Sequence, residues 1–256
     1  MTRLKKDVEA ARDLLDQGHS IAETARRVGI ARATVRDWMT KGFDEILDGR
    51  FTNTDPDGPC AFCRYIRDLT ESSYAYLLGL YLGDGCISEY PRQVYRLRIV
   101  QDTKYPSLIH QCAIAMYWVI PNKVGLVKQH GCTEIGSYSK HWPCLFPQHG
   151  KGPKFKRPIV LEPWQRWVAV ERHPELLLRG LFHSDGCRTV NRVNPRGKPY
   201  EYVRYMFKNC SDDIHGILAD ACDRAGIEWR RSYKWTTSVS KRESVEKLDR
   251  FIGPKS

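Results

Sequence analysis

Two aspartates with matched surroundings are the residues of this sequence best suited to chemistry. Asp84 and Asp185 each end a largely apolar stretch and stand before a Gly-Cys pair, and the two copies lie 101 residues apart. A repeat at domain-sized spacing, with an acid at the same place in both copies, indicates a duplicated unit rather than chance.

Small residues in both stretches suggest how the two acids meet. Gly79 and Gly83 precede the first acid, and Gly180 and Ser184 precede the second, with the same spacing of four residues. Residues four apart share one face of a helix, and small side chains there let two helix backbones approach closely. If the two helices pack through these residues, both acids lie together at the carboxyl ends.

The chemistry expected of such a pair is metal binding. Two carboxylates at the negative ends of two helix dipoles repel each other unless a cation lies between them. Mg²⁺ suits this position, because proteins often hold it with one or two carboxylates plus substrate phosphate oxygens. We also expect Gly85 and Gly186 to end the helices in the left-handed conformation. Two ordinary buried helices with Asp-Gly turns are the alternative, but they do not explain the repeat.

The two stretches, Leu77–Cys86 and Leu178–Cys187, resemble the motif of the LAGLIDADG family of homing endonucleases. The resemblance covers roughly residues 71–253. It implies an α+β fold, a duplicated αββαββα unit with pseudo-two-fold symmetry whose sheets form a saddle on double-stranded DNA. It also implies that Asp84 and Asp185 are metal ligands in DNA cleavage.

The sequence after each motif follows the expected order of strands and helices. Alternating apolar and polar residues, broken by turn residues, predict two hairpins and a further strand pair in each copy. In the first copy we expect strands over 86–89, 94–101, 123–130 and 134–140, with a helix over 106–120. In the second copy we expect strands over 187–193, 200–208, 228–234 and 235–240, with a helix over 211–225 and another at the end.

Matched polar residues supply candidate catalytic partners. Lys140 and Lys241 lie 101 residues apart, and Gln101 and Asn209 lie 108 apart because the second hairpin is longer. In the resembled nucleases a basic residue late in the fourth strand lies near the metal and helps to activate water or stabilise phosphate charge. The resemblance therefore implies catalytic roles for both lysines, with the amides as strand-two partners. Alternatively, the lysines contact phosphates without taking part in chemistry.

In the first 45 residues, helices are expected over 4–17, 21–28 and 32–40, with a capping box at Ser20 and glycine breaks between them. This pattern resembles the helix-turn-helix of bacterial resolvases and regulators. Arg32, Thr34 and Arg36 would face DNA from the third helix. The first 50 residues hold ten basic and nine acidic side chains, so a small helical adaptor without DNA contacts is the alternative.

The net charge of +11 indicates a polyanionic partner, and double-stranded DNA fits the resemblance. The excess belongs to residues 51–256, which hold 31 basic and 21 acidic side chains. The basic residues of the hairpins and of the connection between the copies are the remaining candidate DNA contacts: Arg96, Arg98, Lys154, Lys156, Arg188, Arg192 and Arg204.

The cysteine content predicts reduced thiols in the cytoplasm. Nine cysteines are an odd number for a disulfide framework, and the longest apolar run, Ala113–Ile120, is too short to cross a bilayer. Cys60 and Cys63 are spaced as half of a Zn²⁺ site, but no second Cys-x-x-Cys supplies the other two ligands, and two small thiols in a turn are the commoner outcome. We expect a monomer, because both repeats are in one chain.

These observations divide the chain into five parts. They are a helix-turn-helix domain (1–45), a linker with the Cys-x-x-Cys (46–70), repeat 1 (71–147), a connection (148–172) and repeat 2 (173–256). The favoured interpretation is a Mg²⁺-dependent endonuclease that cuts both strands of a long DNA site. The first alternative is a transcriptional regulator with the same two parts that does not cut, and is nucleoid-associated. The second is an RNA-processing factor.

Overall fold

The structure is a computed structural model that describes residues 5–44, 46, 70–194, 197 and 199–255. The chain forms two compact units, Met1–Phe62 and Cys63–Ser256. The predicted linker, with the candidate zinc ligands Cys60 and Cys63, lies almost wholly outside the described residues.

The first unit contains three helices, α1 (Lys5–Asp16), α2 (Ile21–Val28) and α3 (Arg32–Lys41). The Ser20 side chain caps α2 by accepting a hydrogen bond from the Glu23 N–H at 3.2 Å. Gly29 ends α2 with φ of 70° and turns the chain toward α3. A small core that includes Val35 and Trp38 joins the three helices, as the helix-turn-helix interpretation requires.

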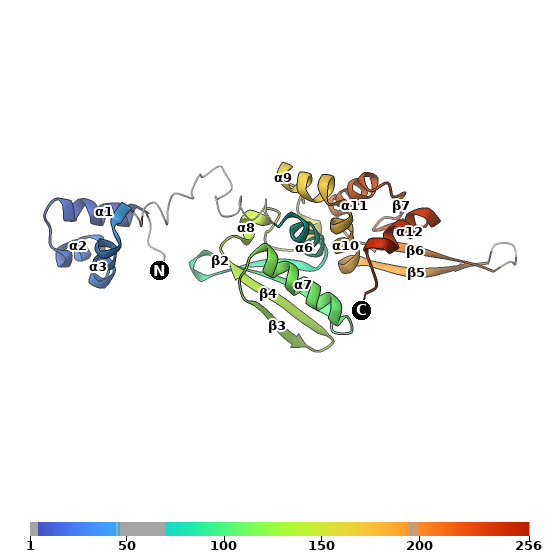
Figure 1. Cartoon of the computed structure of the whole chain (residues 1–256), viewed down its shortest axis with the longest axis horizontal. Coiled ribbons are helices and arrows are strands. Elements are labelled where there is room, and N and C mark those ends of the chain that lie inside the picture. The colour runs from blue at the N-terminus through green and yellow to red at the C-terminus, as the bar shows by residue number, and fades with distance from the viewer. Residues whose placement is uncertain (1–4, 45, 47–69, 195–196, 198, 256) are drawn as a thin grey trace. The chain divides into compact units, whose positions relative to one another are not determined.

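The second unit contains the predicted duplication (Figure 1). The first copy runs α6 (Glu71–Asp84), β1 (Gly85–Tyr90), β2 (Val94–Asp102), α7 (Pro106–Val119), β3 (Val124–Gln129), β4 (Cys132–Ser139), α8 (Trp142–Leu145). The second runs α10 (Pro174–Asp185), β5 (Gly186–Val193), β6 (Tyr200–Lys208), α11 (Asp212–Arg224), β7 (Arg230–Tyr233), β8 (Thr236–Val239), α12 (Arg242–Phe251). Both copies are αββαββα, so the predicted fold class is confirmed.

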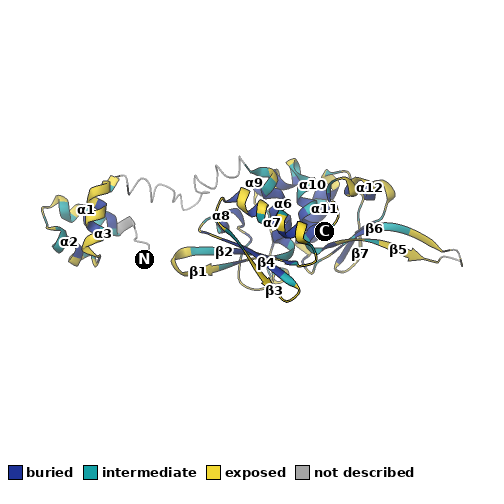
Figure 2. Cartoon of the chain, turned by 60° about the horizontal axis from the view of Figure 1, so that its bottom comes forward, coloured by how far each residue is buried: buried dark blue, intermediate teal, exposed yellow. Residues whose placement is uncertain are grey.

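Each copy builds one antiparallel sheet, with strand orders β1-β2-β4-β3 and β5-β6-β8-β7. Helices lie on one side of the sheets (Figure 2). In β2 the side chains of Leu97 and Ile99 are fully buried on that side, whereas Val100 is 42% exposed. Because side chains alternate across a strand, every second residue of β2 lies on an open face.

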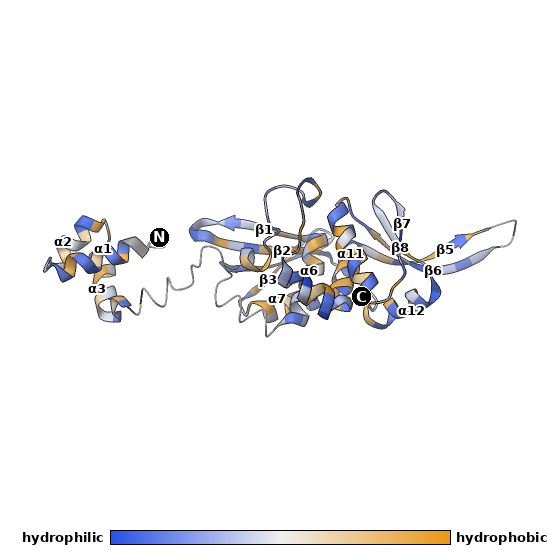
Figure 3. Cartoon of the chain, turned by 90° about the horizontal axis from the view of Figure 1, so that it is seen from above, coloured by the Kyte–Doolittle hydropathy of each residue, from blue (hydrophilic) through white to orange (hydrophobic). Residues whose placement is uncertain are grey.

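The helices α6 and α10 pack against each other through the small residues that the sequence predicts. A Cβ at Gly79 would lie 2.4 Å from the carbonyl oxygen of Leu177, and one at Gly180 would lie 2.3 Å from that of Tyr76. Residues 74–82 of α6 are all buried, which explains why this stretch carries no charged side chain on any side. Figure 3 colours the chain by hydropathy.

The prediction of left-handed glycines at the helix ends is wrong. Gly85 and Gly186 have φ of −84° and −103°, which is extended backbone. Glycine is required there by close approach, since a Cβ would lie 2.5 Å from Cα of Tyr81 and 2.6 Å from Cα of Phe182. Each motif helix therefore passes directly into the first strand of its sheet.

The connection between the copies contains a 3₁₀ turn, η2 (Lys154–Lys156), a helical turn, α9 (Pro163–Gln165), and a π-helix, η3 (Arg166–Arg172). Gln165 is fully buried and donates to the Tyr74 hydroxyl at 2.6 Å. This contact ties the connection to the beginning of α6. Among the described residues, no helix has the length and apolar character needed to span a membrane.

Candidate functional site

The last residues of α6 and α10, Asp84 and Asp185, lie together. A Cβ at Gly83 would be 3.1 Å from Oδ2 of Asp185, so this carboxylate rests against the end of α6. Burial, and then the neighbouring charge of Asp185, raise the pKa of Asp84 to about 6. Burial also raises the pKa of Asp185. The charge of Asp185 thus disfavours the ionised form of Asp84, as the sequence predicts for two adjacent carboxylates.

Each acid accepts a hydrogen bond from the amide expected beside it. Gln101 Nε2 donates to Oδ2 of Asp84 at 2.9 Å, and Asn209 Nδ2 donates to Oδ2 of Asp185 at 2.6 Å. Both bonds favour the charged carboxylate and partly oppose the rise in pKa. The structure thus brings four of the six candidate catalytic residues together.

Two lysines complete this cluster, Lys154 from the connection and Lys255 from the end of the second copy. Lys154 Nζ donates to the Gly83 carbonyl at 3.1 Å and to that of Tyr81. Lys255 Nζ donates to the Ser184 carbonyl at 3.2 Å and to that of Gly186. The ammonium groups thus bind the negative ends of the two motif helices.

The two ammonium groups also interact with both carboxylates. Burial lowers the pKa of Lys154 to about 8, against the attraction of Asp185 and Asp84, and burial lowers the pKa of Lys255 in the same way. The four side chains hold two negative and two positive charges when all are ionised.

Lys255 is the member of the cluster that the sequence reasoning missed, although a signal for it exists. The Gly-Pro-Lys triplet that ends at Lys154 recurs at Lys255, 101 residues later, which is the spacing of the acids. Lys154 itself was predicted as a phosphate contact in the connection.

Lys140 and Lys241 are not part of the cluster. Lys140 is exposed just after β4, and Lys241 is bonded to Glu228 and lies 3.7 Å from Glu243. Within the described part of the chain, neither lysine has a hydrogen bond or ion pair with Asp84 or Asp185. In the described residues, no contact with the acids supports the catalytic role predicted for Lys140 and Lys241.

The open face of the first sheet carries two paired arginines. Arg98 Nη1 lies 3.2 Å from Oε2 of Glu134, and Arg96 bonds the other oxygen of the same carboxylate. The Arg96 guanidinium also lies over the Tyr138 ring, 5.4 Å from its centre. Glu134, which the sequence reasoning did not single out, has a side chain that is only 8% exposed. It fixes both guanidinium groups on this face.

The second sheet separates the predicted DNA contacts. Arg204 alternates with the buried Tyr205 and lies on the open face. Arg188 pairs with Tyr205 across the strands, so it points to the helix side, where its Nε lies 2.8 Å from Asp249 of α12. Arg192 shares that face and lies 2.7 Å from Glu201. Strand periodicity therefore removes Arg188 and Arg192 from the open face.

The remaining predicted DNA contacts lie where they can meet a partner. Arg32 and Arg36 are exposed on α3, and Thr34 is half-buried between them. Lys156 is exposed in η2. None of these side chains belongs to the acid cluster.

As a metal centre, this cluster offers two carboxylates. No group of three or more His, Cys, Asp or Glu side chains within the described ranges is placed to hold an ion. Hard oxygen donors of this kind suit Mg²⁺ when a substrate phosphate supplies further ligands. The donors therefore fit a metal that binds together with nucleic acid.

Comparisons with known proteins find one matching family model and several similar solved structures. Residues 3–36 match the model of the helix-turn-helix domain of resolvase. The chain is similar to the crystal structure of I-DmoI in complex with DNA and Ca (18% identity, 73% of this chain and 92% of that chain, TM-score 0.48). It is also similar to the I-SmaMI LAGLIDADG homing endonuclease bound to cleaved DNA (9% identity, 70% and 83%, TM-score 0.47).

A third similar structure is the N-terminal LAGLIDADG domain of DUF199/WhiA (13% identity, 76% of this chain and 91% of that chain, TM-score 0.43). A comparison with curated protein sequences finds no match. By its own order of elements and by the match at residues 3–36, this chain joins a resolvase-type helix-turn-helix to a duplicated αββαββα unit of the LAGLIDADG fold.

Proposed function

We propose that this protein binds double-stranded DNA as a monomer and cuts both strands with divalent metal ions held at Asp84 and Asp185. One observation carries the proposal. Two half-buried acids, each with its own amide donor and lysine, meet where the motif helices pass into their sheets. Matched groups in two copies suit two similar reactions on two antiparallel strands.

The metal would bind Asp84 and Asp185 together with phosphate oxygens of the DNA. When bound, it supplies an activated water and neutralises the charge that develops on the phosphate. The chain's own amides have a separate task. Gln101 and Asn209 orient the carboxylates by donating to one oxygen of each, which leaves the other oxygen for a ligand.

The lysines Lys154 and Lys255 place positive charge beside the acids. This charge is available to a phosphate that approaches the helix ends, since a Lys is a good phosphate ligand. The pKa of Lys154, near 8, also lets this group hold or release a proton close to neutral pH.

DNA recognition is assigned to the open sheet faces and to α3. Arg96, Arg98 and Arg204 lie on the open faces, where guanidinium groups can reach base edges and phosphates. The net charge of +11 supplies long-range attraction. The helix-turn-helix adds a second contact to the same DNA molecule.

A second function, regulation without cutting, is supported by the same two lysines. Lys154 and Lys255 already neutralise the two acids, so the pair can persist without a metal. In a protein of this kind the cluster would only join the two copies. The similar structures include both a homing endonuclease and a WhiA domain.

The deciding experiment incubates the full chain with a randomised duplex library in Mg²⁺ and in Ca²⁺, and recovers bound and cleaved molecules separately. We expect cut ends in Mg²⁺ that vanish in Asp84→Asn and in Asp185→Asn, whereas binding persists. Asp220→Asn is the matched control, because this aspartate pairs with Arg166 on the surface. Enriched binding without cleavage in either metal would establish the regulator instead.

A further inference from the structure

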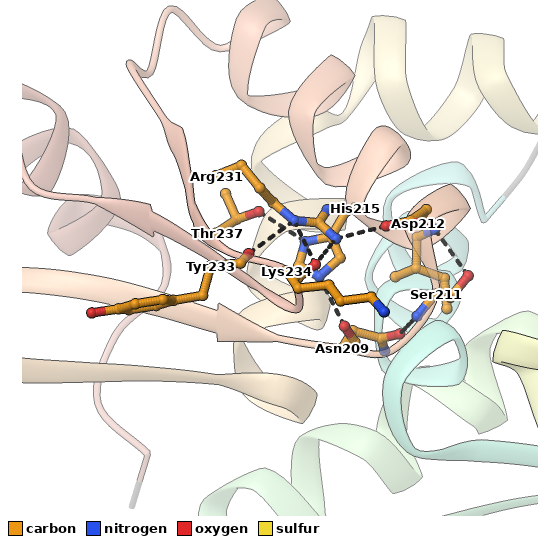
Figure 4. Close-up of polar contacts among 9 residues, drawn as sticks. Asn209, Ser211, Asp212, His215, Arg231, Tyr233, Lys234 and Thr237 are labelled. Carbon is orange, nitrogen blue, oxygen red and sulfur yellow. Dashed lines mark hydrogen bonds and ion pairs between the residues drawn. The ribbon is translucent and has the colours of Figure 1, made fainter.

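The side-chain amide that serves the second acid makes an additional hydrogen bond that its counterpart in the first copy lacks. Asn209 donates its backbone N–H to the Trp235 carbonyl at 3.1 Å, and its Oδ1 accepts from the Ser211 N–H at 2.8 Å. Its carbonyl oxygen lies 3.0 Å from Nε2 of His215 (Figure 4). These contacts leave the Asn209 side chain one orientation, in which Nδ2 points at Asp185.

His215 contacts Asn209 from helix α11. It is buried in the first turns of α11, its Nδ1 lies 2.8 Å from the Thr237 hydroxyl, and its ring packs edge-on against Phe207. Burial lowers the pKa of His215, so the ring is neutral near pH 7. With Thr237 donating to Nδ1, the Nε2–H donates to the Asn209 carbonyl. The histidine therefore links α11 and β8 to Asn209.

The first copy has no such link. Ile109 is the fourth residue of α7, as His215 is of α11. The turn after β2 is made by Asp102, which accepts from the Lys104 N–H at 3.0 Å. Among the described residues, the side chain of Gln101 makes one hydrogen bond, which is the bond to Asp84. The two copies thus position their amides by different means.

We propose that His215 is a positioning residue, which fixes Asn209 and through it the Asp185 carboxylate in the second copy alone. The proposal rests on the proposed nuclease function. If each acid serves one scissile phosphate, loss of His215 slows the cutting of one DNA strand and leaves the other unchanged. A merely structural histidine would affect both strands alike or neither.

The test uses the full chain and a duplex whose strands carry different end labels. Asn209→Ala first identifies the strand that depends on the second copy. His215→Phe, which keeps the ring shape but has no donor, is expected to slow that strand by about 10- to 100-fold, so that nicked DNA accumulates. His215→Gln restores a donor at nearly the same reach and is expected to recover most of the rate.

Equal slowing of both strands, or a nick in the opposite strand, would overturn the proposal. If His215→Phe does not fold, Thr237→Val serves instead, because it removes the hydroxyl that orients the imidazole. That variant is expected to slow the same strand by a smaller factor, and an unchanged ratio of the two strand rates would then count against the proposal.

A second measurement separates this proposal from the nuclease itself. The side-chain amide signal of Asn209 is assigned in an NMR spectrum by its loss in Asn209→Asp. We expect its amide protons to exchange slowly with solvent in the wild type and at least tenfold faster in His215→Phe. If the wild type never cuts DNA, the proposed function fails. An unchanged exchange rate would instead refute the role of His215 directly.

Discussion

The carboxyl group of Asp84 destabilises the folded protein at neutral pH. Its pKa rises from 3.8 to about 6 on folding, because burial and Asp185 disfavour the charge. The folded state therefore binds more protons than the unfolded state between these values, and stability falls as pH rises from about 4 to about 6. At 1.36 kcal/mol for each pKa unit, the full cost above pH 6 is about 3 kcal/mol.

Asp84→Asn is accordingly expected to stabilise the metal-free protein at pH 8 by about 1–3 kcal/mol, since an amide carries no charge there. The gain should shrink toward zero as pH approaches 4. Urea unfolding at pH 8, 6 and 4.5 in the presence of a chelator measures the difference. Asp220→Asn should change stability by less than about 0.5 kcal/mol at every pH. A variant less stable than the wild type at pH 8 would show that the carboxylate is stabilising.

The acids and their amides could be predicted from the sequence because they recur at matched positions in both copies. Lys255 recurs at the same spacing, in the Gly-Pro-Lys triplet that it shares with Lys154, but the repeat alone does not show that both lysines lie at the helix ends, because only folding brings them there. Glu134 is one polar residue in an alternating strand. Glu134 matters because it forms ion pairs with Arg96 and Arg98, which lie on the neighbouring strand β2 and are brought to it only by folding.

At the scale of elements, the seam between α6 and α10 allows no added atoms. A Cβ at Gly79 would meet three backbone atoms of the partner helix at 2.4–2.8 Å, and backbone cannot move aside as a flexible side chain can. Gly79→Ala should therefore lower the free energy of unfolding by at least about 3 kcal/mol, or prevent folding. Denaturant titration, or the yield of folded protein, gives the result.

Gly216→Ala is the matched control for this seam. Gly216 lies inside α11, and nothing is within 4 Å of an added Cβ. The same substitution should there stabilise by about 0.5–1 kcal/mol, because alanine favours a helix more than glycine does. If the two substitutions change the free energy of unfolding by similar amounts, the close approach of α6 and α10 is not needed for stability.

Helix and strand positions could be predicted closely because apolar alternation is a local property. The strands β2 and β6 begin at the expected residues, Val94 and Tyr200. The conformation of Gly85 and Gly186 could not be predicted, since glycine serves both left-handed turns and crowded backbones, and only the packing of Tyr81 and Phe182 decides between them. The side of β5 that Arg188 occupies likewise depends on its register with β6.

At the scale of the whole molecule, the chain joins two units that each have a candidate DNA surface. Two contacts on one DNA molecule strengthen binding beyond either alone, because the second contact forms within the complex. Arg32 and Arg36 are exposed on α3, and the first unit has little other excess charge. If the helix-turn-helix contacts DNA, removing these two side chains should remove most of its contribution.

The double variant Arg32→Ala/Arg36→Ala should therefore bind its preferred site at least about 10-fold more weakly than the wild type, with a shorter footprint. The dependence of affinity on salt should also become less steep, since fewer phosphates are contacted. The control, Arg12→Ala/Arg27→Ala, removes the same charge from α1 and α2 and leaves α3 intact. If both double variants lose the same affinity for DNA, the first unit contributes only non-specific electrostatic attraction. A loss confined to the α3 variant would show that α3 reads part of the target sequence.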